Sequence, residues 1–253
     1  MKSLKLIFIN ILFAFSIYAQ DMNPDAAKLY NEGNQKMKEG NFSVALQLYE
    51  QALAIQKDYR ILYQKGIAHR RMNQLDQAYN ELTEALKLNP DFDLAYNALG
   101  TLEYTRGNYE QSVNNFLKTL ELTKNAQLKS QVQKNISLAY SKLGDQNLKN
   151  FEYEKAIENF KKAIQYDQKN DAAYLALARA YVETGKYAEA LEAADNALKY
   201  RNKISKGGVY YYKGLALKNL GKLNEAKAAF EEGKKDPTYR QVCDYEIKNL
   251  PKQ

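Results

Sequence analysis

The residue types that most often carry catalysis are scarce in this sequence. The chain of 253 residues contains one histidine, His69, and one cysteine, Cys243. Nucleophilic catalysis of the Ser–His–Asp or Cys–His type would depend on His69 alone, and no nucleophile motif accompanies it. One His and one Cys are also too few for a structural zinc site or a disulfide framework within a single chain. We therefore expect no catalytic residue, no metal and no cofactor.

Arginine offers the clearest binding chemistry. Arg60, Arg70 and Arg71 fall on one face of a predicted helix, because ten and eleven residues are close to three helical turns. A guanidinium group can hold a carboxylate through two parallel hydrogen bonds. This arginine cluster therefore suits an acidic segment or the carboxylate at the end of a chain, and a merely solvated polar face is the alternative interpretation.

Composition limits the class of protein to which these residues belong. The chain has 37 Lys+Arg against 30 Asp+Glu, and it is 45% hydrophobic and 26% charged. These values are typical of a soluble folded protein and exclude collagen-like and disordered classes. The length allows one large domain or two small ones.

The first twenty residues form a segment of their own. Two lysines precede an apolar run that ends at Tyr18, and Ala19 supplies a small residue at an expected cleavage point. This is the layout of a secretory signal peptide, and the run is shorter than the roughly 20 residues of a membrane span. We therefore expect residues 1–20 to be removed and the protein to be exported to the periplasm or cell surface, with a Gram-negative bacterium as host. An uncleaved anchor is the alternative.

A repeat of about 34 residues organises the rest of the chain. Its first marker is small, and stands at Gly33, Gly66, Gly100, Gly144, Ala178 and Gly214. A second small residue follows twelve positions later, at Ala45, Ala78, Ser112, Ala156, Ala190 and Ala226. A mostly aromatic position comes four residues after that, at Tyr49, Leu82, Phe116, Phe160, Ala194 and Phe230. Small residues let two helices approach closely, and the larger side chain fills the space between them.

This pattern resembles the tetratricopeptide repeat (TPR), a helix–turn–helix unit. The segment YEKAIENFKKAI at residues 153–164 is a close match. The resemblance implies an all-α fold, a right-handed solenoid of about six helix–turn–helix repeats, within a domain of residues 21–253. The six units are residues 26–58, 59–92, 93–126, 137–170, 171–206 and 207–236.

Four features depart from a plain array of repeats. Unit two has Asn73 at its turn, where units one, three, five and six have Gly, and unit five has Ala194 in place of an aromatic residue. Unit six has Gly233 in place of Ala, which we expect to weaken its second helix. Ten extra residues, about 127–136, keep an apolar period of 3.6 and predict a first helix of unit four that is longer by about 15 Å. This extension is either a packed helix without further role or a contact for a partner.

A capping helix is predicted after the sixth unit, at residues 238–250. Tyr239, Val242, Cys243 and Leu250 recur there at helical spacing. Solenoids need such a cap because the last unit otherwise exposes its core face.

The resemblance further implies that the first helix of each unit lines a concave groove. The candidate partner-binding residues are therefore Tyr30, Asn34, Arg60, Tyr63, Arg70, Arg71, Asn97 and Tyr104. Asn side chains can hold an extended backbone, and Tyr supplies rigid contact area. The carboxylate clamp of some TPR proteins needs a Lys where this chain has Tyr30, so we do not expect that clamp.

These features predict a non-catalytic protein–protein interaction scaffold of the bacterial cell envelope. We expect it to bind a partner segment, acidic or C-terminal, in the concave groove. One alternative is a subunit or accessory factor of an envelope assembly or enzyme complex. A more remote alternative is a solenoid that binds nucleic acid, against which the small net charge argues.

Overall fold

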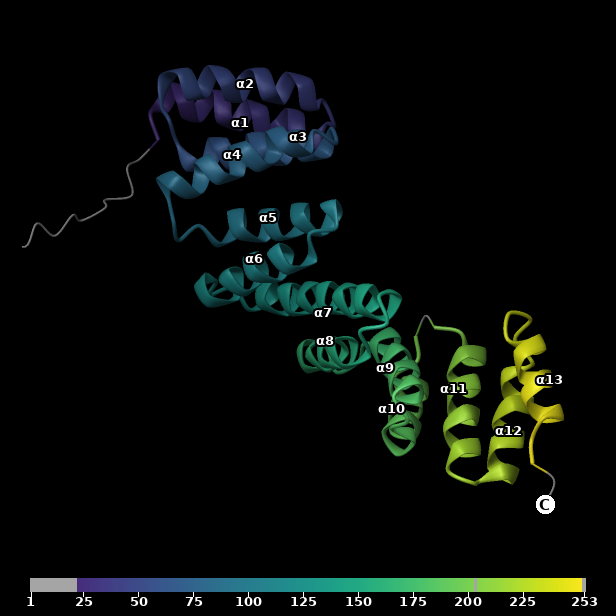
Figure 1. Ribbon diagram of the computed structural model, residues 1–253. Helices are drawn as coiled ribbons and strands as arrows, with labels where there is room; N and C mark the ends of the chain where they lie inside the picture. The colour runs from purple at the N-terminus through teal and green to yellow at the C-terminus, as the bar shows by residue number, and fades with distance from the viewer. Residues whose placement is uncertain (1–21, 203, 252–253) are drawn as a thin grey trace, which may run out of the picture.

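The computed structural model describes residues 22–202 and 204–251, and this part of the chain folds into thirteen α-helices without a β-strand (Figure 1). The predicted signal peptide, residues 1–20, lies outside the described residues. The helices are α1 (Pro24–Lys38), α2 (Phe42–Ile55), α3 (Tyr59–Arg71), α4 (Leu75–Leu88), α5 (Asp93–Arg106), α6 (Tyr109–Leu122), α7 (Ala126–Lys149), α8 (Tyr153–Tyr166), α9 (Asp171–Glu183), α10 (Tyr187–Lys199), α11 (Lys206–Asn219), α12 (Leu223–Gly233) and α13 (Arg240–Lys248).

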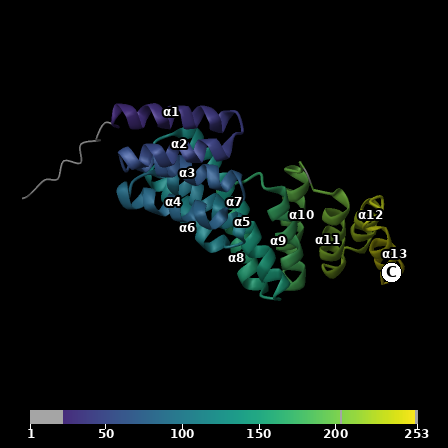
Figure 2. The same cartoon turned by 90° about the horizontal axis from the view of Figure 1, so that it is seen from above.

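Consecutive helices form six hairpins, from α1–α2 to α11–α12, and each hairpin packs against the next. In Figure 1 the helices α1 to α4 lie across the view, whereas α11 and α12 run down it, so the helix direction turns along the stack. Figure 2 shows the same progression from α1 to α13 along one elongated molecule. The predicted all-α solenoid of six helix–turn–helix units is confirmed. None of the described helices is long and apolar enough to cross a membrane.

The two helices of a unit begin in different ways. Among the first helices, α1, α3, α7, α9 and α11 have a side-chain cap, in which an Asn, Asp or Ser oxygen accepts from backbone N–H groups of the first turn. The second helices have no such cap and begin directly after the turn. The sequence therefore marks the start of every unit but the third with a polar cap, and the middle of each unit with a tight turn.

That turn requires a backbone with positive φ. The residues that adopt it are Gly40, Asn73, Gly107, Phe151, Gly185 and Gly221. Glycine takes this conformation at little cost, and Asn tolerates it better than other residues do. Asn73 therefore substitutes for glycine in unit two, whereas Phe151, at φ 60°, is the exception among the six.

The repeated small residues let the two helices of a unit touch. A Cβ atom added to Gly144 would lie 2.5 Å from Cε1 of Phe160, and one added to Gly100 would lie 2.6 Å from Cδ1 of Phe116. No real carbon pair approaches so closely without a shift of the neighbouring ring. In each of these units, the absence of a side chain at the glycine thus leaves the space that the aromatic ring fills.

The lengthened first helix of unit four is confirmed. Helix α7 has 24 residues, whereas α5 has 14 and α9 has 13. Its additional turns bury Val132 and Ile136 completely, against Phe116 of α6. The extension is therefore a packed part of the core along one of its faces.

The capping helix is also present, with two differences from the prediction. Helix α13 begins at Arg240 and covers unit six with the fully buried Cys243. Val242, which we expected on the inner face, is 40% exposed, because its neighbour Cys243 occupies the position that faces α12. Gly233 ends α12 after only 11 residues, and a Cβ there would lie 2.8 Å from Sγ of Cys243. Its lack of a side chain thus makes room for the cap.

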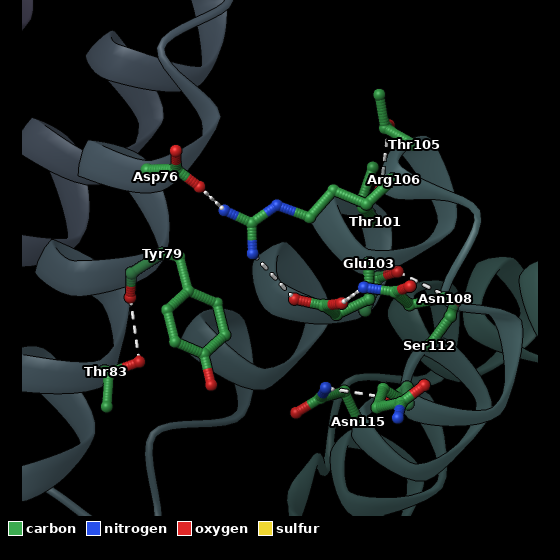
Figure 3. Close-up of polar contacts among 12 residues, drawn as sticks. Asp76, Tyr79, Thr83, Thr101, Glu103, Thr105, Arg106, Asn108, Ser112 and Asn115 are labelled. Atoms are coloured by element: carbon green, nitrogen blue, oxygen red, sulfur yellow. Dashed lines mark hydrogen bonds and ion pairs between the residues drawn. The ribbon is translucent and has the colours of Figure 1, made fainter.

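One charged contact ties unit two to unit three (Figure 3). Arg106 of α5 lies 2.5 Å from Asp76 of α4 and 3.2 Å from Glu103, and its guanidinium group lies 5.1 Å from the ring centre of Tyr79. Glu103 is almost completely buried, and its second oxygen accepts from Asn108 at 2.7 Å. The contact fixes α5 against α4 and so positions the groove residues that α5 carries.

Candidate partner-binding groove

The first helices of units one to three are spatial neighbours. Helix α1 contacts α3, and α3 contacts α5. The eight candidate residues are divided among these helices, with Tyr30 and Asn34 on α1, four residues on α3, and Asn97 and Tyr104 on α5. They are all at least partly exposed, so the structure permits the predicted groove face.

In unit one, the two candidate residues also contribute to the packing of the unit. The hydroxyl group of Tyr49 donates to Oδ1 of Asn34 at 2.8 Å, and the rings of Tyr30 and Tyr49 are 6.2 Å apart. This bond fixes the Asn34 amide and leaves its NH₂ group as the donor for a partner.

The three arginines lie along the same helix, α3, but at its two ends. Arg60 stands at the start of α3 and pairs with Asp58, the N-cap residue, at 2.6 Å. Arg70 and Arg71 stand at the other end of α3, ten residues away, which is about 15 Å along a helix. A shared helix face brought the three side chains into line but not into contact.

Arg70 is the arginine with an unusual environment. Its Nε atom is buried and has no hydrogen-bond partner. Burial and the positive charge of Arg71 lower the pKa of the Arg70 guanidinium, which nonetheless stays charged at neutral pH. Burial raises the pKa of nearby Tyr63, whose ring packs edge-on against Phe92 with centroids 5.2 Å apart. Arg71 itself is exposed.

Helix α5 contributes a second buried polar atom without a hydrogen-bond partner, and it lines a small pocket. Oδ1 of Asn97 is buried without a hydrogen-bond partner. About two turns further on, Tyr104 lines a pocket of about 80 Å³ together with Thr101, Phe116, Asn135 and Leu138. Asn135 belongs to the extension of α7, so its place in the pocket could not be read from the repeat pattern.

A second hollow, of about 290 Å³, lies further along the solenoid. It is lined by Tyr109, Lys142, Asp145, Gln146, Leu148, Lys149 and Arg179. Lys142 and Asp145 pair at 3.6 Å, while Lys149 and Arg179 have no ion-pair partner among the described residues. The prediction chose units one to three and so missed this hollow, although it contains two unpaired cations.

The single histidine has a local polar contact. Nδ1 of His69 lies 2.7 Å from Oε1 of Gln74, the N-cap residue of α4. Within residues 22–202 and 204–251, no three His, Cys, Asp or Glu side chains are grouped as a metal ion would need.

Comparison with known proteins gives a consistent answer about the family. Models of the tetratricopeptide repeat match residues 63–123, 147–203 and 208–235. The DnaJ homolog subfamily C member 7 of Homo sapiens is 29% identical over 127 residues, which are 44% of this chain and 26% of that protein. The small glutamine-rich tetratricopeptide repeat-containing protein 2 of Saccharomyces cerevisiae is 26% identical over 98 residues, which are 38% of this chain and 28% of that protein. The chain thus spans little more than a quarter of either relative.

A solved structure shows the same fold. MamA from Desulfovibrio magneticus RS-1 superposes with a TM-score of 0.52 at 21% identity, over 73% of this chain and 99% of that one. At this identity the likeness concerns the fold alone. Three matches to one repeat along the chain, together with six stacked hairpins, lead to one conclusion: the chain belongs to the tetratricopeptide repeat family.

Proposed function

We propose that this chain is a non-catalytic scaffold that binds an acidic or C-terminal segment of another protein along α1, α3 and α5. Membership of the TPR family supports a role in protein–protein interaction. The signal-like residues 1–20 support a place in the periplasm or at the cell surface of a Gram-negative bacterium.

One observation carries the proposal for the groove. Among the described residues, only two buried side-chain atoms lack a hydrogen-bond partner, and these are Nε of Arg70 and Oδ1 of Asn97. Leaving a buried polar atom unpaired costs about 1–3 kcal/mol. Both atoms belong to neighbouring first helices, α3 and α5, and both residues were predicted from the sequence to face a partner.

Both atoms are buried in the free protein, so the two side chains must turn outward before a partner can offer them complementary groups. Nε of Arg70 donates a hydrogen bond, and Oδ1 of Asn97 accepts one. An extended segment offers both, because a carboxylate or carbonyl oxygen accepts and a backbone N–H donates. The positive charge of Arg70 and Arg71 favours a carboxylate as the acceptor.

A peptide with a free carboxylate at its end tests this proposal directly. The probe is a fluorescein-labelled acidic peptide, compared with its C-terminally amidated form by fluorescence anisotropy on the full chain. The variant Arg70→Glu/Arg71→Glu should weaken binding at least about tenfold, since charge-assisted hydrogen bonds contribute about 1.5–3 kcal/mol each. The control is Lys87→Glu on α4, an exposed residue of the second helix of unit two.

A second variant separates binding from folding. Asn97→Leu removes an unpaired buried oxygen, so the free protein should keep or raise its melting temperature. The same change should weaken the peptide about threefold to tenfold, the range of one net hydrogen bond. Equal affinity of wild type, Asn97→Leu and the double arginine variant would refute binding at this groove.

The proposed export of the protein and the removal of residues 1–20 are tested by a separate measurement. N-terminal sequencing of the protein from the native envelope should give a chain that begins near Gln20. A chain that retains Met1 would contradict the cleavage and favour an anchor.

A further inference from the structure

The junction between units two and three is the least extensive of the junctions between units. Among the described residues, α4 packs against α5 over a smaller region than the second helix of any other unit does against the first helix of the next unit. Its apolar part is one buried cluster, formed by Ala78 and Leu82 of α4 with Ala98, Leu99 and Leu102 of α5. Because neighbouring units hold a solenoid together through such contacts, this junction is where the array can bend most easily.

The buried side-chain atoms without a hydrogen-bond partner lie on the helices of this junction. Nε of Arg70 belongs to α3 and Oδ1 of Asn97 belongs to α5, and α3 and α5 contact each other. The arrangement in the structure therefore keeps a donor and an acceptor from water without giving either of them a bond, which is unfavourable. Separation of the two units would let water reach both atoms, so these atoms oppose the apolar contact.

An aromatic contact holds the junction at one end. Phe92 is the N-cap residue of α5, and its ring packs edge-on against Tyr59 at 4.9 Å and Tyr63 at 5.2 Å between ring centroids. Both tyrosines belong to the first half of α3. Aromatic packing does not depend on a charge pair, so salt does not release it.

An ion pair holds the junction at the other end (Figure 3). Helix α5 has 14 residues, so Arg106, its last residue, lies about 20 Å from Phe92. Arg106 reaches across to α4, where it lies 2.5 Å from Asp76 and its guanidinium group lies 5.1 Å from the ring centre of Tyr79. The Asp76 side chain is 94% exposed, and ion pairs with so exposed a partner are weak and are screened by salt.

This ion pair can break without leaving a buried charge unpaired. Arg106 also lies 3.2 Å from Glu103, a residue of its own helix, and Glu103 accepts from Asn108 at 2.7 Å. These two contacts lie within unit three, so they persist when Arg106 and Asp76 separate. The large penalty for an isolated buried charge therefore does not oppose the separation.

We propose that the junction between units two and three is a hinge, with the Phe92 contact as its pivot and the Arg106–Asp76 pair as its latch. The structure shows the closed arrangement, and in the open one α5 rotates away from α4 at the Arg106 end. Salt favours the open arrangement because it screens the latch. Opening also exposes Nε of Arg70 and Oδ1 of Asn97, and only the use of this exposure by a partner rests on the proposed function.

Double electron–electron resonance on the full chain without any partner tests the hinge. Nitroxide labels are placed on Val44→Cys and Gln111→Cys, with Cys243→Ala as background. Both positions are exposed, at the starts of α2 and α6, and the distance between them crosses the proposed hinge. The matched control pair is Lys155→Cys/Glu225→Cys, at the equivalent exposed positions of units four and six.

Loss of the latch should lengthen the distance between the labels of the first pair. A rotation by about 15° about a pivot about 20 Å away moves the Arg106 end of α5 by about 5 Å, so Arg106→Gln should add a population longer by about that amount. An increase of sodium chloride from about 0.05 M to about 0.5 M should do the same in the chain with Arg106. The control pair should keep its distances under both changes.

Asn97→Leu should act in the opposite direction. It removes a buried oxygen without a partner, so the closed arrangement becomes more favourable and the long distances should be less populated at about 0.5 M salt. The opposite effects of Asn97→Leu and Arg106→Gln distinguish a hinge from a general loss of stability.

Three results would overturn the hinge. The first is a Val44–Gln111 distance distribution that neither Arg106→Gln nor salt changes, the second is equal broadening for both label pairs, and the third is a larger long-distance population in Asn97→Leu. The salt series needs no substitution at the junction, so it decides the matter even where a variant fails to fold. A hinge that moves as expected in a chain that binds no acidic peptide would refute the proposed function alone.

Discussion

At the scale of single residues, one close contact is repeated in almost every unit. A glycine of the first helix lies against a large side chain of the second, as Gly33 lies against Tyr49 and Gly214 against Phe230. Unit five instead has Ala178 and Ala194 at these two positions, and both are fully buried. A larger residue on one helix and a smaller one on the other preserve the volume of the contact.

The buried alanines should tolerate no added volume. Ala190→Leu in α10 should lower the free energy of unfolding by about 1–3 kcal/mol, because the added isopropyl group does not fit a close-packed core. Ala188→Leu places the same change two residues away, at an exposed position of the same helix, and should change stability by less than about 0.5 kcal/mol. Denaturant unfolding measures both, and equal midpoints would show that the repeat register is wrong.

At the scale of elements, the irregular parts of the array have structural explanations. The extension of α7 buries Val132 and Ile136, so its apolar period marks a core-facing side. The cap α13 buries Cys243 against α12 and adds an ion pair at 2.7 Å between Lys218 and Glu246. These contacts replace the neighbour that a seventh unit would have supplied.

Removal of the cap should expose that core face. A chain that ends at residue 237 should have a lower melting temperature and associate at increasing concentration, because Phe230 and its neighbours lose their cover. Static light scattering and thermal unfolding measure the two effects. Tyr245→Ser, which changes only an exposed residue of α13, is the control. A truncated chain that stays monomeric with an unchanged melting temperature would show that α13 is not a cap.

At the scale of the whole molecule, buried and half-buried phenols and one buried thiol make the fold sensitive to alkali. Burial raises the pKa of Cys243 to about 11 and that of Tyr212 to about 12. Burial also raises the pKa of Tyr49, Tyr63 and Tyr211. In the unfolded chain these groups ionise near their ordinary values, about 9 for the thiol and about 10 for the phenols.

The raised pKa values predict a loss of stability as the pH rises. Each group contributes its full stabilisation below its unfolded pKa, and loses it as the pH passes through the folded value. The denaturant midpoint should therefore be level up to about pH 8.5 and fall between about pH 9 and 12. Cys243→Ala should make the decline between about pH 9 and 11 shallower. A midpoint that stays constant over this range would contradict the burial of these groups.

The sequence by itself determined the architecture of this protein. The period of small and aromatic residues gave the six units, the glycines located the turns, and the apolar period of residues 127–136 predicted the long α7. These features are local, because spacing along a helix decides which side chains share a face. The candidate residues followed from the resemblance to the tetratricopeptide repeat, which places the first helices in a groove, and Asn97 and Arg70 were among them.

Only the tertiary structure decided which of those residues are available to a partner. Spacing placed Arg60, Arg70 and Arg71 on one face of α3, but only the structure shows that Arg60 is engaged by Asp58. The unpaired atoms of Arg70 and Asn97, the pocket beside Tyr104 and the unpaired charges of Lys149 and Arg179 depend on side chains from different units. The repeat determines which side chains each unit places on a given helix face. Burial, hydrogen bonding and charge pairing between units depend on distances between side chains of different units, and the spacing within one unit does not encode those distances.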